Sequence, residues 1–143
     1  MKTVREILDK KGQEVHTIDV DDSVLNAIRI LADKRIGSLV VQKNDKTVGL
    51  FSERDYTCKV ILTGKRSENT PVGDIMSQKL LVVHPDTSIQ DCMVLMTEKR
   101  IRHLPVVEDD QLVGLVSIGD IVKDIISEQQ VVIEQLEQYV YYS

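Results

Sequence analysis

The order of hydrophobic and polar positions is nearly the same in two stretches of the chain. Residues 23–61 and 88–126 align without a gap, each position of the second stretch lying 65 places after its counterpart. The identities include charged and polar residues as well as apolar ones, so the pattern indicates a duplicated unit rather than a shared hydrophobic rhythm. In the first copy the recurring residues are Lys34, Arg35, Ile36, Leu39, Val41, Asp45, Val48, Gly49, Leu50, Ser52 and Asp55.

Each copy predicts the order strand, helix, strand, strand, helix. Polar residues ahead of apolar residues at helical spacing mark the start of a helix, and short apolar runs around a polar turn mark an antiparallel hairpin. The first copy has expected strands at 14–18, 38–42 and 47–51, a helix from Ser23 to about Arg35, and a helix that ends near Gly64. The second copy has expected strands at 80–83, 103–107 and 112–116, a helix at 88–99, and a helix from about Gly119.

Three details refine this pattern. Pro105 lies inside an expected strand and has no N–H group, which predicts either an edge position or an interruption of the ladder. Residues 4–7 resemble residues 72–76, so a short segment of similar structure is expected before each copy. Residues 63–71 are polar and rich in helix breakers, as is typical of a linker.

Length and composition favour one structural module. With 143 residues and 42% hydrophobic content, the chain can form one ordinary globular core. A repeat of about 60 residues is marginal as an independent folding unit, so the copies are expected to share a core across a pseudo-twofold axis. We therefore predict an α/β (α+β) fold of two β-α-β-β-α repeats, residues 1–66 and 67–143, with an extended C-terminal helix.

The last helix is expected to be longer than its counterpart in the first copy. Its apolar residues lie near one stripe, while Glu128, Glu134 and Glu137 mark a more polar side. The stripe either packs onto its own module or forms a contact between two copies in a homodimer, and the sequence leaves both interpretations open. The stripe consists of Val122, Ile125, Ile126, Gln129, Ile133, Leu136 and Val140.

The charge distribution argues against nucleic-acid and membrane partners. The formal net charge is −5 and the basic residues are scattered, whereas DNA-binding proteins concentrate lysine and arginine on one face. The sequence also contains neither a stretch of ~20 apolar residues, which a membrane-spanning helix needs, nor an N-terminal secretion signal. A cytoplasmic location is the simplest interpretation.

Cysteine and histidine do not predict a metal site. Cys58 and Cys92 do not form a C-x-x-C pair, and His16, His84 and His103 lack the spacing that would bring two ligands to one helical face. Free cysteine packs like a small hydrophobic residue, so we expect both thiols to be buried and reduced.

The strongest local signal is a Ser-x-x-Asp turn that follows an apolar strand in each copy. Ser52 and Asp55 form it in the first copy, and Ser117 and Asp120 in the second. One interpretation is a capping box, in which the hydroxyl and the carboxylate satisfy backbone amides at the start of a helix. The other is a nucleoside phosphate site, because free amides at a helix N-terminus favour phosphate and a nearby carboxylate binds ribose hydroxyls.

Several stretches resemble the tandem cystathionine-beta-synthase (CBS) domain pair, or Bateman module, in its stand-alone bacterial form. The resemblance covers the chain from about Val4 to Ile126. It implies a β-α-β-β-α fold in each repeat, frequent homodimerisation into a disc, and an adenosine-containing ligand such as AMP, ATP, NAD or S-adenosylmethionine between the repeats. The stretches that carry it are 86–88, 99–107, 112–117 and Asp120, with their first-copy counterparts.

The family pattern implies two clefts, each with an acid from one copy and facing residues from the other. The first cleft would combine Thr17, Ile18, Ser52, Arg54 and Asp55 with Arg102 and His103. The second would combine Val83, Ser117 and Asp120 with Gly37 and Ser38. Only the first cleft has cations facing it, so we expect it to bind phosphate-bearing ligands more tightly. Structural roles are the alternative: charge balance for Arg54, a surface charge for Arg102 and a backbone contact for His103.

These expectations lead to a regulatory function. The resemblance implies that an adenine nucleotide binds the module and changes how it acts on a separate enzyme or transporter. The alternative is a structural dimerisation module with vestigial clefts. An enzyme is not expected, because the sequence has no G-x-x-x-x-G-K loop, no nucleophile elbow and no metal-spaced cluster. We assign no catalytic residue and no catalytic cofactor, and the choice among AMP, ATP and NAD stays open.

Overall fold

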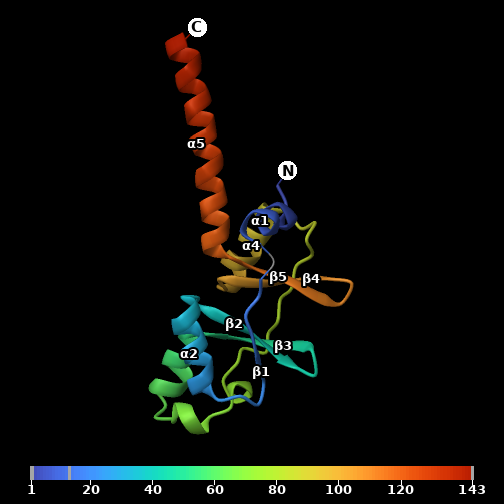
Figure 1. Cartoon of the computed structure of the whole chain (residues 1–143), viewed down its shortest axis with the longest axis vertical. Helices are drawn as coiled ribbons and strands as arrows, with labels where there is room; N and C mark the ends of the chain where they lie inside the picture. The colour runs from blue at the N-terminus through green and yellow to red at the C-terminus, as the bar shows by residue number, and fades with distance from the viewer. Residues whose placement is uncertain (1, 13, 143) are drawn as a thin grey trace. The chain divides into compact units, whose positions relative to one another are not determined.

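Two compact units make up the chain in the computed structural model, which describes residues 2–12 and 14–142 (Figure 1). One unit is continuous, Glu14–Val82, and the other combines Met1–Gln13 with Val83–Ser143. The continuous unit contains the first repeat together with the short segment that leads into the second. The segments that lead into the two repeats are thus exchanged between the units, and the division of the sequence into repeats between residues 66 and 67 stays a prediction.

The continuous unit contains a three-stranded sheet of order β1-β2-β3. Strand β2 (Ser38–Lys43) is parallel to β1 (Thr17–Asp19) and antiparallel to β3 (Lys46–Ser52). This arrangement confirms the predicted hairpin. The other elements are α2 (Val24–Lys34), α3 (Glu53–Tyr56), the π-helix η1 (Thr57–Ile61), and the 3-10 helices η2 (Ser67–Asn69) and η3 (Val72–Asp74).

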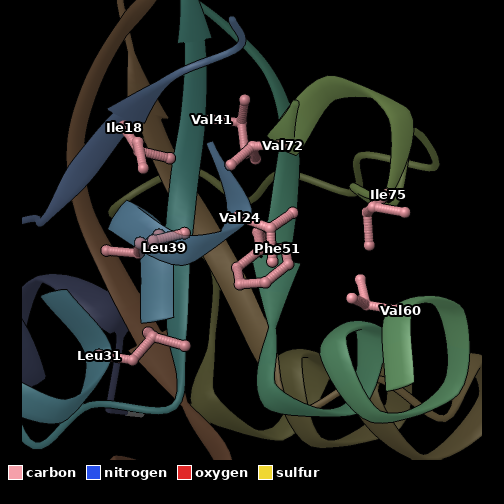
Figure 2. Close-up of a cluster of buried hydrophobic side chains, with 10 residues drawn as sticks. Ile18, Val24, Leu31, Leu39, Val41, Phe51, Val60, Val72 and Ile75 are labelled. Carbon is pink, nitrogen blue, oxygen red and sulfur yellow. The ribbon is translucent and has the colours of Figure 1, made fainter. Parts of the chain in front are cut away.

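The core of this unit explains why η3 belongs to it. Phe51 of β3 is fully buried, and Val72 and Ile75 from the η3 segment join the same cluster (Figure 2). The chain then passes close to β3, because a Cβ on Gly49 would lie only 2.6 Å from the Met76 sulfur. Glycine at that position permits the approach. The rest of the cluster comprises Ile18, Val24, Ala27, Leu31, Leu39, Val41 and Val60.

The discontinuous unit combines the N-terminal helix with the second repeat. Val4, Ile7 and Leu8 of its first helix are buried, and a Cβ on Gly114 would lie 2.6 Å from a methyl carbon of Leu8. The apolar face of this helix is thus covered by the second repeat. The elements of the unit are α1 (Val4–Lys11), α4 (Ile89–Lys99), β4 (His103–Glu108), β5 (Gln111–Ser117) and α5 (Ile118–Tyr142).

The predicted strand at 80–83 does not form a full strand, and Pro105 gives the reason. In the first repeat the Val40 amide donates to the carbonyl of His16, 3.2 Å away, and Pro105 occupies the position equivalent to Val40 without an N–H group. Only Val83 forms a bridge, to Val106, so the second sheet has two strands, β4 and β5. Pro105 pairs with Leu115, so the β4–β5 ladder continues through it, and the predicted interruption is confirmed only on the other side of β4, toward residues 80–83.

The two thiols differ in their environment. Cys92 is buried, and burial, with a smaller contribution from the Asp91 carboxylate, raises the pKa of its thiol to about 11. Cys58 is exposed on the η1 turn, so the expectation that both thiols are buried is wrong for Cys58. The π-helical turn differs in pitch from an α-helix, and the sequence pattern does not predict it.

The last helix extends well beyond the other elements of its unit (Figure 1). Ile121 and Asp124 are buried, but every residue from 126 to 140 is exposed. The interpretation that the apolar stripe packs onto its own module is therefore wrong for residues 126–140. Within the described part of the chain, no helix combines the length and the hydropathy that a membrane-spanning helix requires.

Candidate functional site

The two Ser-x-x-Asp turns form closed capping boxes at the ends of β3 and β5. We call Ser52–Asp55 the first corner and Ser117–Asp120 the second corner. In each corner the aspartate amide donates to the serine hydroxyl, at 3.2 Å in the first and 3.0 Å in the second, and the serine amide donates to the aspartate carboxylate. The capping interpretation is thereby confirmed for both turns.

Further amides at the corners are also engaged. The amide of Glu53 donates to the Gly37 carbonyl at 3.1 Å, and the amide of Ile118 donates to the Arg102 carbonyl at 2.9 Å. The serine and aspartate amides are used within the boxes. The prediction of free amides for phosphate is therefore wrong for these six positions.

The carboxylate of the first corner pairs with a lysine of its own helical segment. Asp55 is buried, and its Oδ2 accepts from the Ser52 amide at 3.0 Å and from the Ser52 hydroxyl at 3.1 Å. Its Oδ1 lies 3.0 Å from the Lys59 ammonium, four residues further along. Lys59 also donates to the Ile75 carbonyl, so it joins the corner to the η3 segment.

The carboxylate of the second corner pairs with a lysine from a distant part of the sequence. The Lys11 ammonium lies 2.7 Å from Asp120 Oδ2 and 2.8 Å from the Leu115 carbonyl oxygen. Burial alone would raise the pKa of Asp120, but hydrogen bonds from Lys11 and from the Ser117 backbone outweigh it and lower the pKa. The second corner thus holds an ionised carboxylate with a cation already bound.

The sheet register places one further polar side chain opposite the serine of each corner. Ser38 is paired with Ser52 across β2 and β3, and His103 is paired with Ser117 across β4 and β5. Ser38 is only 3% exposed, and its hydroxyl has no hydrogen-bond partner within residues 2–12 and 14–142. An unpaired buried hydroxyl costs about 1–3 kcal/mol, so Ser38 is a destabilising polar group opposite the first corner.

The remaining predicted site residues divide between core and surface. Ile18 and Val83 are buried, and Ile18 belongs to the core cluster of its unit. Thr17, Arg54 and Arg102 are exposed. The continuous unit brings together Thr17, Ile18, Ser38, Ser52, Arg54 and Asp55, and the discontinuous unit brings together Val83, Arg102, His103, Ser117 and Asp120. The pairing of each corner with residues of the opposite repeat stays a prediction.

Sequence reasoning missed the two lysines that pair with the corner carboxylates. Lys59 follows Asp55 at the i,i+4 spacing of helical ion pairs, so that pattern could have identified it. Lys11 lies 109 positions before Asp120 in the sequence, and no local pattern connects them. Among the described residues, no group of three or more histidine, cysteine or acidic side chains has a geometry that could hold a metal ion.

The repeats match a known family along most of the chain. The family model of the CBS domain matches twice, over residues 4–58 and 72–127. The chain belongs to the CBS-domain family. The two matches correspond to the two repeats, so the protein is a tandem CBS pair, and the fold expected from the resemblance is confirmed.

This CBS pair is similar to a named plant protein and to a CBS domain of known structure. The mitochondrial CBS domain-containing protein CBSX3 of Arabidopsis thaliana is 36% identical over 147 residues, which cover 96% of this chain and 71% of that protein. The crystal structure of the CBS domain protein NE2398 is 46% identical, covers 87% of this chain and 98% of its own, and superimposes with a TM-score of 0.84.

A third CBS pair has been solved with small molecules bound. The CBS domain pair of protein MJ0100, in complex with 5′-methylthioadenosine and S-adenosyl-L-methionine, has a TM-score of 0.80. It is 24% identical and covers 90% of this chain and 98% of its own. At this identity the comparison shows that the two proteins share the fold.

Proposed function

We propose that this CBS pair is a sensor of adenine nucleotides that regulates a separate protein. CBS pairs are regulatory modules of the signal-transduction class, which are generally non-catalytic. We propose in addition that a ligand of the AMP, ATP or NAD class binds at the Ser-x-x-Asp corners. No catalytic residue and no catalytic cofactor belong to this proposal.

The buried, unpaired hydroxyl of Ser38 is the observation that carries the proposal. It lies in register with Ser52, whose hydroxyl donates to the Asp55 carboxylate at 3.1 Å. We therefore assign Ser38 to the first corner and not to the second cleft, which the family pattern implied. A buried polar group without a partner is rare in folded proteins and is commonly explained by a ligand or water that completes it. A nucleoside offers hydroxyl groups that satisfy Ser38 and donate to Asp55 together.

The chemistry of the corners fits the sugar of a nucleoside more directly than its phosphate. Carboxylates bind the vicinal hydroxyls of ribose in other nucleotide sites. Both ligands of the MJ0100 pair contain an adenosyl group, which supports the same ligand class here. Phosphate recognition is assigned to a cation, Arg54, which is exposed at the first corner.

The first corner is proposed to bind more tightly than the second. The experiment is calorimetric titration of AMP, ATP and NAD into the wild type, Asp55→Asn and Asp120→Asn. We expect Asp55→Asn to lose most of the binding and Asp120→Asn to lose little. Equal losses in the two variants would refute the asymmetry, and absence of binding to the wild type would refute the nucleotide assignment itself.

The regulated partner is proposed to be a separate enzyme or transporter in the cytoplasm. A bound ligand can shift the module between two states only by its different affinity for each state, so the partner must distinguish those states. Co-purification of partners with and without added nucleotide tests this. A partner set that does not depend on nucleotide would contradict the sensor role.

The exposed stripe of α5 favours a second function, structural dimerisation with vestigial ligand sites. Ile126, Ile133 and Val140 alternate with Leu136 and Gln129 at spacings of three and four, and β-branched residues alternating with leucine in this way favour two-stranded coiled coils. We propose a homodimer through this stripe. Truncation after Ser127 is expected to convert the dimer to a monomer in sedimentation experiments, and a dimer that survives truncation would exclude the role of the helix.

A further inference from the structure

Lys11 already occupies the acid of the second corner. Its ammonium lies 2.7 Å from Asp120 Oδ2, and the same oxygen accepts the Ser117 amide at 2.9 Å. The second hydrogen bond of Lys11, to the Leu115 carbonyl at 2.8 Å, holds the ammonium at the end of β5. Both side chains of the ion pair are largely shielded, with 34% of Lys11 and 23% of Asp120 exposed.

The lysine is held in place by the rest of the N-terminal segment. Asp120, Asp124 and Glu128 lie four residues apart along one face of α5. Lys2 pairs with Asp124 at 3.2 Å and with Glu128 at 3.1 Å. Lys10 lies 3.4 Å from Asp124 and pairs with that acid rather than with Asp120. Three lysines of one segment thus face three acids of α5, and Lys11 is the one that reaches the corner.

The first corner is built differently. Its lysine, Lys59, belongs to the same helical segment as Asp55 and also donates to the Ile75 carbonyl, and at 47% exposed it is more open to solvent than Lys11. In the second repeat the position equivalent to Lys59 is Asp124, which has the opposite charge. The second corner therefore takes its cation from α1, and removing that cation disturbs a contact between two helices.

We propose that Lys11 is a built-in competitor for ribose at the second corner and determines which corner a nucleoside prefers. This inference rests on the proposed function. A vicinal diol that donates to Asp120 Oδ2 competes with Lys11 for that oxygen. A charged donor forms the stronger hydrogen bond to a carboxylate, so a neutral hydroxyl is at a disadvantage until the ammonium leaves. Ligand entry at the second corner then releases the end of α1 from β5.

The test isolates the second corner and removes the lysine. Asp55→Asn serves as the background, so that binding at the first corner is suppressed. The test variant adds Lys11→Met to this background, which keeps the length of the side chain without its charge. The matched control adds Lys10→Met, on the same helix. The probe is adenosine, which has the diol and no phosphate, with 2′-deoxyadenosine as the probe that lacks one of the two hydroxyls. Binding is measured by calorimetry, and thermal unfolding confirms that each variant is folded.

Lys11→Met is expected to bind adenosine about five- to tenfold more tightly than the background. In the background the ligand must break an ion pair worth ~1 kcal/mol, and in Lys11→Met that cost is absent. Lys10→Met is expected to stay within about twofold of the background, and the gain is expected to be absent for 2′-deoxyadenosine. Lys11→Arg, which retains the charge, is expected to behave like the background.

Unchanged or weaker adenosine binding in Lys11→Met would overturn the inference, as would an equal gain in Lys10→Met. In either case adenosine binding by the wild type would still stand, so the proposed function would survive. If the wild type binds no adenosine or nucleotide, both the proposed function and the inference fail.

Discussion

Ser38 allows a prediction in which stability and ligand binding change in opposite directions. Its side chain is 3% exposed and its hydroxyl lacks a partner among the described residues, whereas Ser88 is 9% exposed and its hydroxyl accepts the Asp91 amide at 3.0 Å. The two serines are similarly buried and differ in hydrogen bonding. Ser88→Ala is therefore the matched control for Ser38→Ala.

Without ligand, Ser38→Ala is expected to stabilise the protein. An unsatisfied buried hydroxyl costs about 1–3 kcal/mol, and the small cavity left by the oxygen offsets part of the gain. A net increase of about 1 kcal/mol in the free energy of unfolding corresponds to a rise of about 2–4 °C in Tm for a chain of this size. Ser88→Ala removes a helix cap and is expected to lower the free energy of unfolding by about 1 kcal/mol.

With saturating ligand, the stability advantage of Ser38→Ala over the wild type is expected to disappear. Loss of one hydrogen bond to the ligand, ~1 kcal/mol, weakens binding about fivefold, so nucleotide should raise the Tm of Ser38→Ala less than that of the wild type. Ser88→Ala should show the full increase. The assays are thermal unfolding and calorimetry with AMP, ATP and NAD. A destabilised Ser38→Ala, or one that binds nucleotide as tightly as the wild type, would refute the reasoning.

Three further predictions concern other parts of the fold. The folded-state pKa of Asp120 is lowered, so its ionised form stabilises the protein above the unfolded pKa of about 3.9, and this contribution disappears as the pH falls through the folded pKa. In urea unfolding, the difference in free energy of unfolding between wild type and Asp120→Asn should be constant between about pH 5 and 7 and should shrink below about pH 4. A difference that stays constant at low pH would contradict the ion pair. Gly49→Ala should destabilise the protein by about 1–3 kcal/mol, and by more than Gly114→Ala. The added methyl at Gly49 meets a backbone carbonyl as well as a side chain, whereas at Gly114 it meets only a side chain. Equal losses of stability in the two variants would contradict this. Cys58 should react with a thiol reagent in the native protein and Cys92 should react only on unfolding, which mass spectrometry can follow; rapid modification of Cys92 would show that its burial is transient.

The sequence predicted the repeat, the two hairpins and the polar corners because each depends on local spacing. The hairpin over residues 38–52 and the capping boxes are set by residues close together in the chain. Pro105 predicted the interruption of the second sheet because the missing N–H is a property of the residue itself. In each case the information lies within a few residues.

What the sequence could not predict depends on contacts between distant residues. The Lys11–Asp120 pair and the packing of α1 against the second repeat follow from the folded arrangement. The engagement of the Glu53 amide by the Gly37 carbonyl also depends on strand pairing, so the amides of the first corner could not be recognised as satisfied. The exposure of Cys58 depends on a π-helical turn that helical periodicity does not describe.

The exchange of leading segments has a consequence for the order of events during synthesis. The residues of Glu14–Val82 emerge from the ribosome consecutively, so this half of the molecule can acquire its core while translation continues. Helix α1 emerges earlier but lacks its packing surface until β5 has been made, more than 100 residues later. The first segment to be translated is thus among the last to be buried, and a gene fragment that stops at residue 66 omits part of the hydrophobic cluster around Phe51.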